Sequence, residues 1–98
     1  MKAAQLINER KNDGETAFLQ MVIWQVPQPV PGSTHLFKYR LVYVVADECV
    51  LRYDNETGKG DHKHLGGAEL PYAFTSIAAL IADFRTDIQR WKDENGLV

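Results

Sequence analysis

The sequence has one cysteine, no long apolar run and little net charge, and each shortage excludes a class of protein. A lone Cys49 cannot form an internal disulfide, which is typical of a reducing, cytoplasmic setting. No segment approaches the roughly 20 consecutive apolar residues that span a bilayer, and no apolar run follows the opening residues as in a secretory signal. The net charge of −2 argues against bulk attraction to nucleic acid, so local basic clusters count for more. We expect a cytoplasmic protein with no membrane partner.

The size of the chain indicates one domain. Its 98 residues are 45% hydrophobic and 24% charged, which is an ordinary globular composition near the lower size limit for a self-sufficient core. We therefore take residues 1–98 as a single domain. Because so small a core is marginal, a partner chain can add stability, and a homodimer stays open.

Turn signals divide the first third of the chain. The dipeptide Asp13-Gly14 is typical of a two-residue hairpin loop, which would pair Leu6 with Met21 on an apolar face. A helix over residues 3–11 is the alternative, because most of these residues are good helix formers. The proline-rich residues 27–34 cannot continue a strand or helix and predict a stiff connector.

The clearest strand covers residues 35–45. Every second residue from Phe37 to Val45 is aromatic or large and apolar, and the residues between them include Lys38 and Arg40. Its partner covers residues 49–54, and two loop lengths can join them. A two-residue loop buries Arg52, whereas a three-residue loop pairs Tyr43 with Leu51 on the core face. We prefer the second register, which places charged side chains together on the face away from the core. These are Lys38, Arg40, Arg52 and Asp54.

The remainder of the chain predicts a loop and then a helix. Residues 57–71 hold four glycines and few sizeable apolar residues, so we expect a long loop that is functional or disordered. Apolar residues then recur at helical spacing, at Ile77, Leu80, Ile81, Phe84, Ile88 and Trp91. Thr75 or Ser76 can cap this helix and Gly96 can end it, with Asp83, Asp87, Asp93 and Glu94 on its solvated face. The expected fold class is α+β, a small antiparallel meander of about four strands packed against a C-terminal amphipathic helix.

The stretch from Arg52 to His64 has the residues most suited to chemistry. His62 and His64 are two residues apart, so on an extended backbone both imidazoles project to one side and Lys63 points away. Two histidines can serve as general acid and general base near neutral pH, as metal-free RNA cleavage requires, while cations stabilise the phosphate charge. The expected catalytic residues are His62, His64, Lys59 and Arg52, the expected substrate-binding residues are Lys38, Arg40, Lys63 and Asn55, and the expected orienting residues are Asp54 and Asp61. A solvated polar loop without chemistry is the alternative.

A second interpretation makes His62 and His64 metal ligands, with His35 or Asp61 completing the set. A tetrahedral site needs at least three protein ligands, and the spacing does not fix the third. Cys49 is a poor further ligand, because the preferred register turns it into the core. We therefore expect no metal and no cofactor, and keep a metal-dependent hydrolase or nuclease as an alternative.

Two segments give the sequence a family likeness. They are His35-Leu36-Phe37-Lys38-Tyr39-Arg40-Leu41, and Tyr53-Asp54-Asn55 followed by Gly60-Asp61-His62-Lys63-His64. These segments resemble the TumE family, small toxins of bacterial and archaeal type II toxin-antitoxin pairs. The resemblance runs through most of the chain. It implies a growth-inhibiting protein neutralised by an antitoxin that is encoded by a neighbouring gene and typically has a DNA-binding domain.

The working hypothesis is therefore a toxin that acts as a metal-independent endoribonuclease, an RNA-binding hydrolase. RNA cleavage itself rests on the side-chain chemistry and on analogy with other small toxins. The opposing class is a non-enzymatic module whose loop and open face bind a protein partner or regulate transcription with the antitoxin. The pI of about 5.8 fits that opposing class better.

Overall fold

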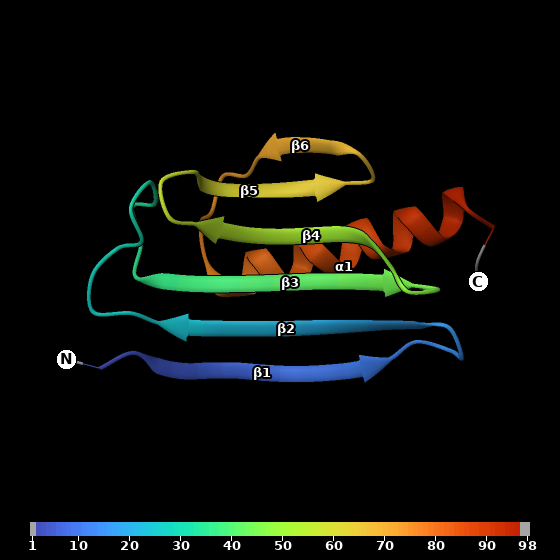
Figure 1. The fold of residues 1–98 in the computed structure, drawn as a ribbon, viewed down its shortest axis with the longest axis horizontal. Coiled ribbons are helices and arrows are strands. Elements are labelled where there is room, and N and C mark those ends of the chain that lie inside the picture. The colour runs from blue at the N-terminus through green and yellow to red at the C-terminus, as the bar shows by residue number, and fades with distance from the viewer. Residues whose placement is uncertain (1, 97–98) are drawn as a thin grey trace.

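The computed structural model describes residues 2–96, and they form one antiparallel sheet with a single helix along one face (Figure 1). The elements in chain order are β1 (Ala4–Asn12), β2 (Ala17–Gln25), β3 (Phe37–Val45), β4 (Glu48–Glu56), β5 (Gly60–Leu65), β6 (Ala68–Pro71) and α1 (Ile77–Glu94). Strands that are neighbours in the sequence are neighbours in the sheet, which is a meander from β1 to β6. The expected α+β class is confirmed, with six strands in place of about four. No described helix is long and apolar enough to cross a membrane.

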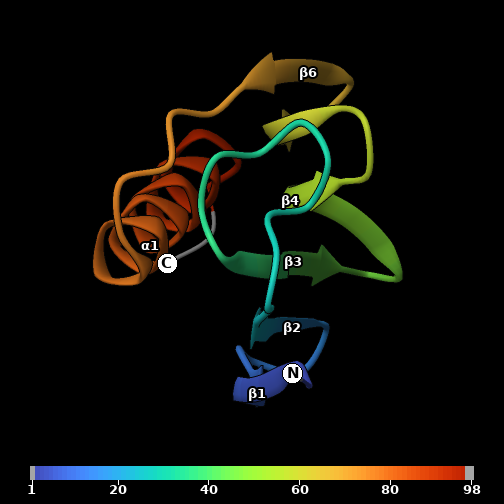
Figure 2. The same ribbon diagram turned by 90° about the vertical axis from the view of Figure 1, so that its left-hand side faces the viewer.

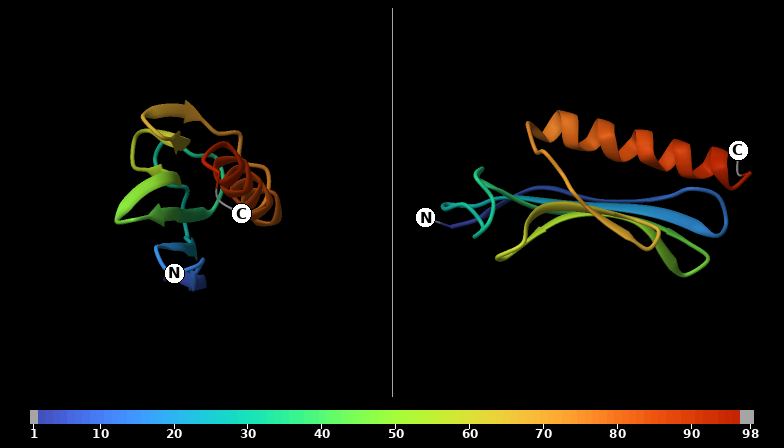
Figure 3. Two further views of the ribbon diagram at one scale, coloured as in Figure 1. Left: turned by 90° about the vertical axis from the view of Figure 1, so that its right-hand side faces the viewer. Right: turned by 90° about the horizontal axis from the view of Figure 1, so that it is seen from above.

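The helix covers one face of the sheet and leaves the other uncovered, as the edge-on view shows (Figure 3). Its residues Leu80 and Phe84 are fully buried against the sheet, together with Leu41, Tyr43 and Tyr53 from β3 and β4. The ring of Phe84 meets that of Tyr53 edge-on, with centroids 5.8 Å apart. Burial of this apolar face contributes most of the stability of the fold.

Both ends of the helix follow the sequence prediction. The Ser76 side chain accepts the backbone N–H of Ala79 at 3.0 Å, which makes Ser76 the N-cap. Asn95 is the C-cap, and Gly96 follows with a φ of 71°, a conformation that glycine adopts without strain.

The predicted register between β3 and β4 is confirmed. Tyr43 pairs with Leu51 on the core face, and Arg40 pairs with Asp54 on the open face. The loop is shorter than predicted, however, because β3 and β4 are joined by two residues rather than three. The register is restored by an irregularity that follows the Tyr43 pair.

This irregularity is a bulge that gives β4 one extra residue, and it overturns the prediction for Cys49. Val44 pairs with Cys49 and Tyr43 with Leu51, so Val50 is the residue without a partner. Val50 is buried in the core cluster, whereas Cys49 is exposed. The observed two-residue loop therefore does not bury Arg52. The extra residue in β4 places Leu51 and the residues after it on the faces that were predicted for a three-residue loop.

The N-terminal hairpin forms, but its predicted register is wrong. Met21 pairs with Glu9 instead of Leu6, because the chain turns over residues 13–16 instead of over Asp13-Gly14 alone. In the same register, Ile23 pairs with Ile7. The helical alternative for this segment does not form.

The long loop expected over residues 57–71 is also wrong. Most of the segment forms the hairpin β5–β6, and only residues 57–59 and 66–67 remain between strands. The sequence does not predict β5 because its residues on the helix side include Asp61 and Lys63, where an ordinary strand has apolar side chains. The usual alternation of apolar and polar residues is therefore missing from β5.

The predicted connector is present between β2 and β3, where residues 26–36 form neither strand nor helix. It arches over the end of the sheet toward β5 (Figure 2). Gly32 lies against Gly60, and a methyl group added to Gly32 would come within 2.6 Å of the Gly60 backbone nitrogen. This close approach fixes the connector to the start of β5.

Replacing Gly32 by alanine should therefore destabilise the protein more than the same change at Gly14. Both glycines have positive φ, but nothing lies within 4 Å of the methyl group at Gly14. The backbone conformation should cost about 1–2 kcal/mol in each variant, and overpacking should add roughly 1–3 kcal/mol at Gly32 only. Urea unfolding measures both. Equal losses would show that the contact between Gly32 and Gly60 is not tight.

Acid should weaken the contact that joins the first turn to the helix. Hydrogen bonds from the Tyr43 hydroxyl, at 2.8 Å, and from Lys92 lower the pKa of Asp13 below its usual value. A lowered pKa stabilises the fold above the unfolded-state pKa, and that contribution disappears as the pH falls through the folded-state pKa. We expect Asp13→Asn to lower the urea midpoint at pH 7, with the difference from wild type narrowing below about pH 4. A difference that is constant with pH would contradict this.

Candidate functional site

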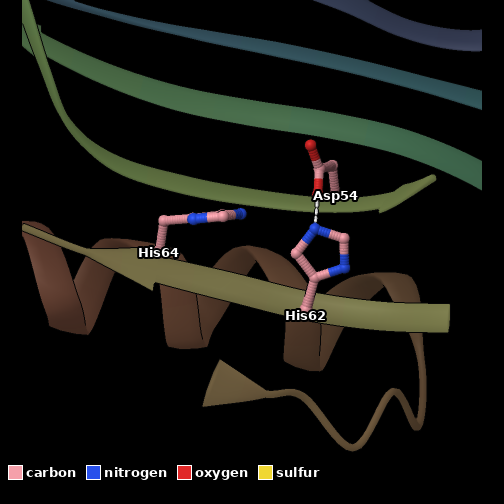
Figure 4. Close-up of side chains that lie close together, drawn as sticks. All are labelled: Asp54, His62 and His64. Carbon is pink, nitrogen blue, oxygen red and sulfur yellow. Dashed lines mark ion pairs between the residues drawn. The ribbon is translucent and has the colours of Figure 1, made fainter. Parts of the chain in front are cut away.

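Polar side chains of β4 and β5 meet on the face of the sheet that the helix leaves uncovered. Arg52 pairs with His64 across these strands, and Asp54 pairs with His62. The four residues are called the open-face site below. As expected from the two-residue spacing, the two imidazoles project to the same side, with ring centroids 5.0 Å apart (Figure 4).

Asp54 and His62 form the buried part of the open-face site. Their exposed fractions are 5% and 4%, and Asp54 Oδ1 lies 2.6 Å from His62 Nε2. On its other side, His62 Nδ1 lies 3.0 Å from the backbone oxygen of Gly60. A carboxylate this deeply buried requires positive charge or hydrogen-bond donors nearby.

Arg52 and His64 form the accessible part. The guanidinium Nη2 of Arg52 lies 2.9 Å from His64 Nε2, and its Nε lies 3.1 Å from Asp54 Oδ2. Because guanidinium only donates, His64 Nε2 is the acceptor and carries no proton in this arrangement. The Arg52 side chain is 30% exposed and His64 is half-buried, so both can be reached from solvent.

Two further predicted residues extend the same face onto β3. Arg40 pairs with Asp54, and it lines a shallow hollow of about 210 Å³ with Gln20, Val22 and Val42. Lys38 is exposed two residues earlier on the same strand and points to the same side. A strip of positive charge therefore adjoins the open-face site.

Lys63 and Asn55 lie on the helix side of the sheet, away from the open-face site. Lys63 Nζ is 3.2 Å from Asp87 Oδ2 of α1, and the same carboxylate oxygen accepts the Tyr53 hydroxyl. Asn55 is buried, where its side chain donates to the Phe37 carbonyl at 2.7 Å. The structure gives both residues structural contacts in place of the substrate contacts that we expected.

Lys59 and Asp61 lie at the end of the sheet, beside a pocket of about 380 Å³ under the connector. Asp61 accepts hydrogen bonds from Ser33 Oγ at 2.6 Å and from the Tyr39 hydroxyl at 2.7 Å. The pKa of Tyr39 is raised far above its usual value by burial and by this carboxylate. Asp61 therefore anchors the connector and does not contact the histidines of the open-face site.

His35 belongs to the same anchor, so it cannot be the third metal ligand. Its Nδ1 accepts the Phe37 backbone N–H at 3.2 Å, and its Nε2 lies 2.6 Å from Asp61 Oδ2. Among the residues that the structure describes, the group with metal-ligand geometry is Asp54, His62 and His64, whose ligand atoms all lie within 4.8 Å of one another.

Two acidic residues near these sites were not predicted. Asp87 was assigned to the solvated face of the helix, but it is buried and faces the sheet. It follows Leu80 by seven residues, a helical spacing that could have placed it on the apolar stripe. Glu69 lies opposite His64 on β6, a strand that the sequence analysis did not find.

Comparison with protein-family models matches residues 4–92 to the family described as Toxin TumE. The chain belongs to the TumE toxin family. It is thus the toxin component of a toxin-antitoxin system, and its partner is an antitoxin. No curated protein and no solved structure matched the chain.

In this TumE toxin, Asp61→Asn should loosen the connector and destabilise the fold. The amide replaces one acceptor oxygen by a donor that faces other donors, which should cost on the order of 2–4 kcal/mol. Asp83→Asn is the matched control, because Asp83 also accepts a tyrosine hydroxyl, that of Tyr72 at 2.5 Å, but at an exposed position. The control should cost less than about 1 kcal/mol in urea unfolding. Similar losses would contradict the anchoring role of Asp61.

Proposed function

We propose that this toxin inhibits growth by cleaving RNA at the open-face site. The observation that supports the proposal is the contact between Arg52 and His64, which places a proton-transfer group beside a cation on the accessible side of the sheet. RNA cleavage needs both features, because a proton must leave the 2′-hydroxyl while negative charge builds up on the phosphate.

His64 is the better placed of the two histidines to contact a substrate. It is half-buried, and its unprotonated Nε2 is directed at Arg52. His62 is 4% exposed and lies between Asp54 and the Gly60 carbonyl, so it supports the site from beneath. The two-histidine mechanism expected from the sequence would require His62 to become accessible.

The proposed reaction is attack of the 2′ oxygen on the adjacent phosphorus. His64 accepts the 2′-hydroxyl proton, the bond from phosphorus to the 5′ oxygen breaks, and the imidazolium returns the proton to that departing oxygen. Arg52 releases His64 and pairs with the phosphate, with Arg40 and Lys38 binding neighbouring phosphates of the strand. The products are a 2′,3′-cyclic phosphate and a 5′-hydroxyl.

The cellular setting of this reaction follows from the toxin class. We propose that the toxin acts in the cytoplasm and that its antitoxin is a DNA-binding protein encoded by a neighbouring gene. Neutralisation would then require the antitoxin to cover the open-face site. Homodimer formation stays a prediction, which light scattering of the purified toxin can test.

Expression without antitoxin should arrest growth, and the purified toxin should cut end-labelled RNA. His64→Gln should lower the cleavage rate by roughly 100- to 10,000-fold, since glutamine can still bond Arg52 but cannot transfer a proton. The same variant should relieve the growth arrest.

Two controls make this experiment specific. Lys59→Met alters a lysine outside the open-face site, beside the pocket under the connector, and should leave the cleavage rate within about threefold of wild type. DNA of the same sequence lacks the 2′-hydroxyl and should not be cut. Growth arrest that persists in the His64→Gln variant would contradict the proposal, and arrest without RNA cleavage would favour a non-enzymatic binding module.

A further inference from the structure

Asp54 Oδ1 and His62 Nε2 face each other in the buried part of the open-face site without forming a hydrogen bond. They form an ion-pair contact at 2.6 Å, yet within residues 2–96 neither atom has a hydrogen-bond partner. Both side chains are more than nine-tenths buried. Arg52 Nε, 3.1 Å from Asp54 Oδ2, likewise has no hydrogen-bond partner. Unpaired buried polar atoms are costly, so the unpaired acceptor atoms of Asp54 and His62 indicate a place for a bound cation.

The protonation of His62 supports the same conclusion. Its Nδ1 lies 3.0 Å from the Gly60 carbonyl, which can only accept, so the ring proton is on Nδ1. In the neutral imidazole, Nε2 then directs its lone pair toward the Asp54 carboxylate. A histidine that donates its other ring N–H to a backbone carbonyl is the arrangement usual for metal ligands.

Two more ligands lie within reach of the same point. A ligand atom of His64 lies within 4.8 Å of those of Asp54 and His62. Glu69 Oε1 on β6 lies 3.8 Å from His62 Nε2. Three adjacent strands therefore contribute two imidazoles and two carboxylates.

We propose that Asp54, His62, His64 and Glu69 bind a divalent transition-metal ion such as Zn²⁺. Ligand atoms on one such ion lie about 3–3.5 Å apart, so the side chains need to shift by roughly 1 Å. The mixed nitrogen and oxygen ligands suit Zn²⁺ or Co²⁺, whereas Mg²⁺ and Ca²⁺ prefer oxygen alone.

Arg52 competes with this ion for its ligands. Its guanidinium lies 2.9 Å from His64 Nε2 and brings positive charge to the Asp54 carboxylate, so the ion and Arg52 compete for the same two ligands. The side chain is 30% exposed and can swing outward. Binding of the ion would thus direct Arg52 toward solvent, where a phosphate can meet it.

The ion site itself does not depend on RNA being the substrate. Only its consequence for catalysis rests on the proposed function: an ion bound to a ring nitrogen of His64 occupies the lone pair that accepts the 2′-hydroxyl proton, so the ion-bound form should not cleave RNA. Cleavage by ion-loaded protein should then rise when a chelator removes the ion, which agrees with the metal-independent mechanism expected from the sequence.

The test is to titrate the metal-free protein with Co²⁺ and follow its visible absorption, and then to displace Co²⁺ with Zn²⁺. We expect one ion per chain, and no displacement by Mg²⁺. His62→Gln should weaken binding by at least about 100-fold, and Glu69→Gln, at a more exposed position that spares the fold, by about 10-fold. Glu56→Gln, on the same strand as Asp54 but exposed, is the matched control and should bind Co²⁺ as wild type does.

Arg52→Gln gives the sharpest result, because it should tighten Co²⁺ binding by roughly 10-fold while slowing RNA cleavage. Absence of a Co²⁺ band, or affinity unchanged in both the His62 and Glu69 variants, would overturn the ion site. One bound ion together with no RNA cleavage by the metal-free protein would instead overturn the proposed function alone. Chelator-resistant cleavage by protein that binds no Co²⁺ would overturn the ion site and leave the proposed function standing.

Discussion

The buried carboxylate of Asp54 is the constraint on which the open-face site depends. It lies in a central strand at 5% exposure, where an uncompensated charge would be strongly destabilising. Arg52, next but one on the same strand, and His62, directly opposite on β5, are the groups that face it. The compensation is incomplete, since His62 Nε2 and Asp54 Oδ1 share no hydrogen bond. This incompleteness distinguishes the cluster from an ordinary structural ion pair.

The two faces of the sheet have different roles: the covered face stabilises the fold, and the open face holds the open-face site. On the covered face, Lys63 and Tyr53 contact Asp87 of the helix, and apolar residues supply most of the stability. On the open face, polar residues of β4 and β5 alternate with that core, and Arg52 and His64 remain within reach of solvent. Because successive residues of a strand point to opposite faces, one short stretch of sequence contributes to both. His64 can therefore change without loss of the core.

The sequence was sufficient to predict register and helix ends where the pattern of side chains indicates which positions are buried or cap a helix. The pairing of Tyr43 with Leu51 followed from matching apolar residues across the strands, and the helix ends followed from Ser76 and Gly96. It was insufficient for β5, because Asp61 and Lys63 make the inner face of this strand polar as well and so remove the apolar alternation, and β6 has only four residues. The bulge at Val50 could not be predicted either. A two-residue loop followed by a bulge gives the same register as a three-residue loop without one.

The candidate site was predictable in part from residue spacing and strand pairing. The spacing of His62 and His64 placed both imidazoles on one side, and pairing placed Arg52 and Asp54 on the open face. The sequence prediction includes Asp61, Lys63 and Asn55 in that site, although strand alternation directs them to the other side. Glu69 required knowledge of β6, which only the three-dimensional structure supplies.

The central claim is that His62 and Asp54 share a bound cation beneath His64. Nitrogen-15 NMR of the imidazole rings tests it most directly, because the chemical shift of each ring nitrogen distinguishes protonated, free and metal-bound states. We predict that His62 has its proton on Nδ1 and that Zn²⁺ shifts the Nε2 resonance of His62 together with one ring nitrogen of His64. A His62 with its proton on Nε2, unaffected by Zn²⁺, would contradict the claim.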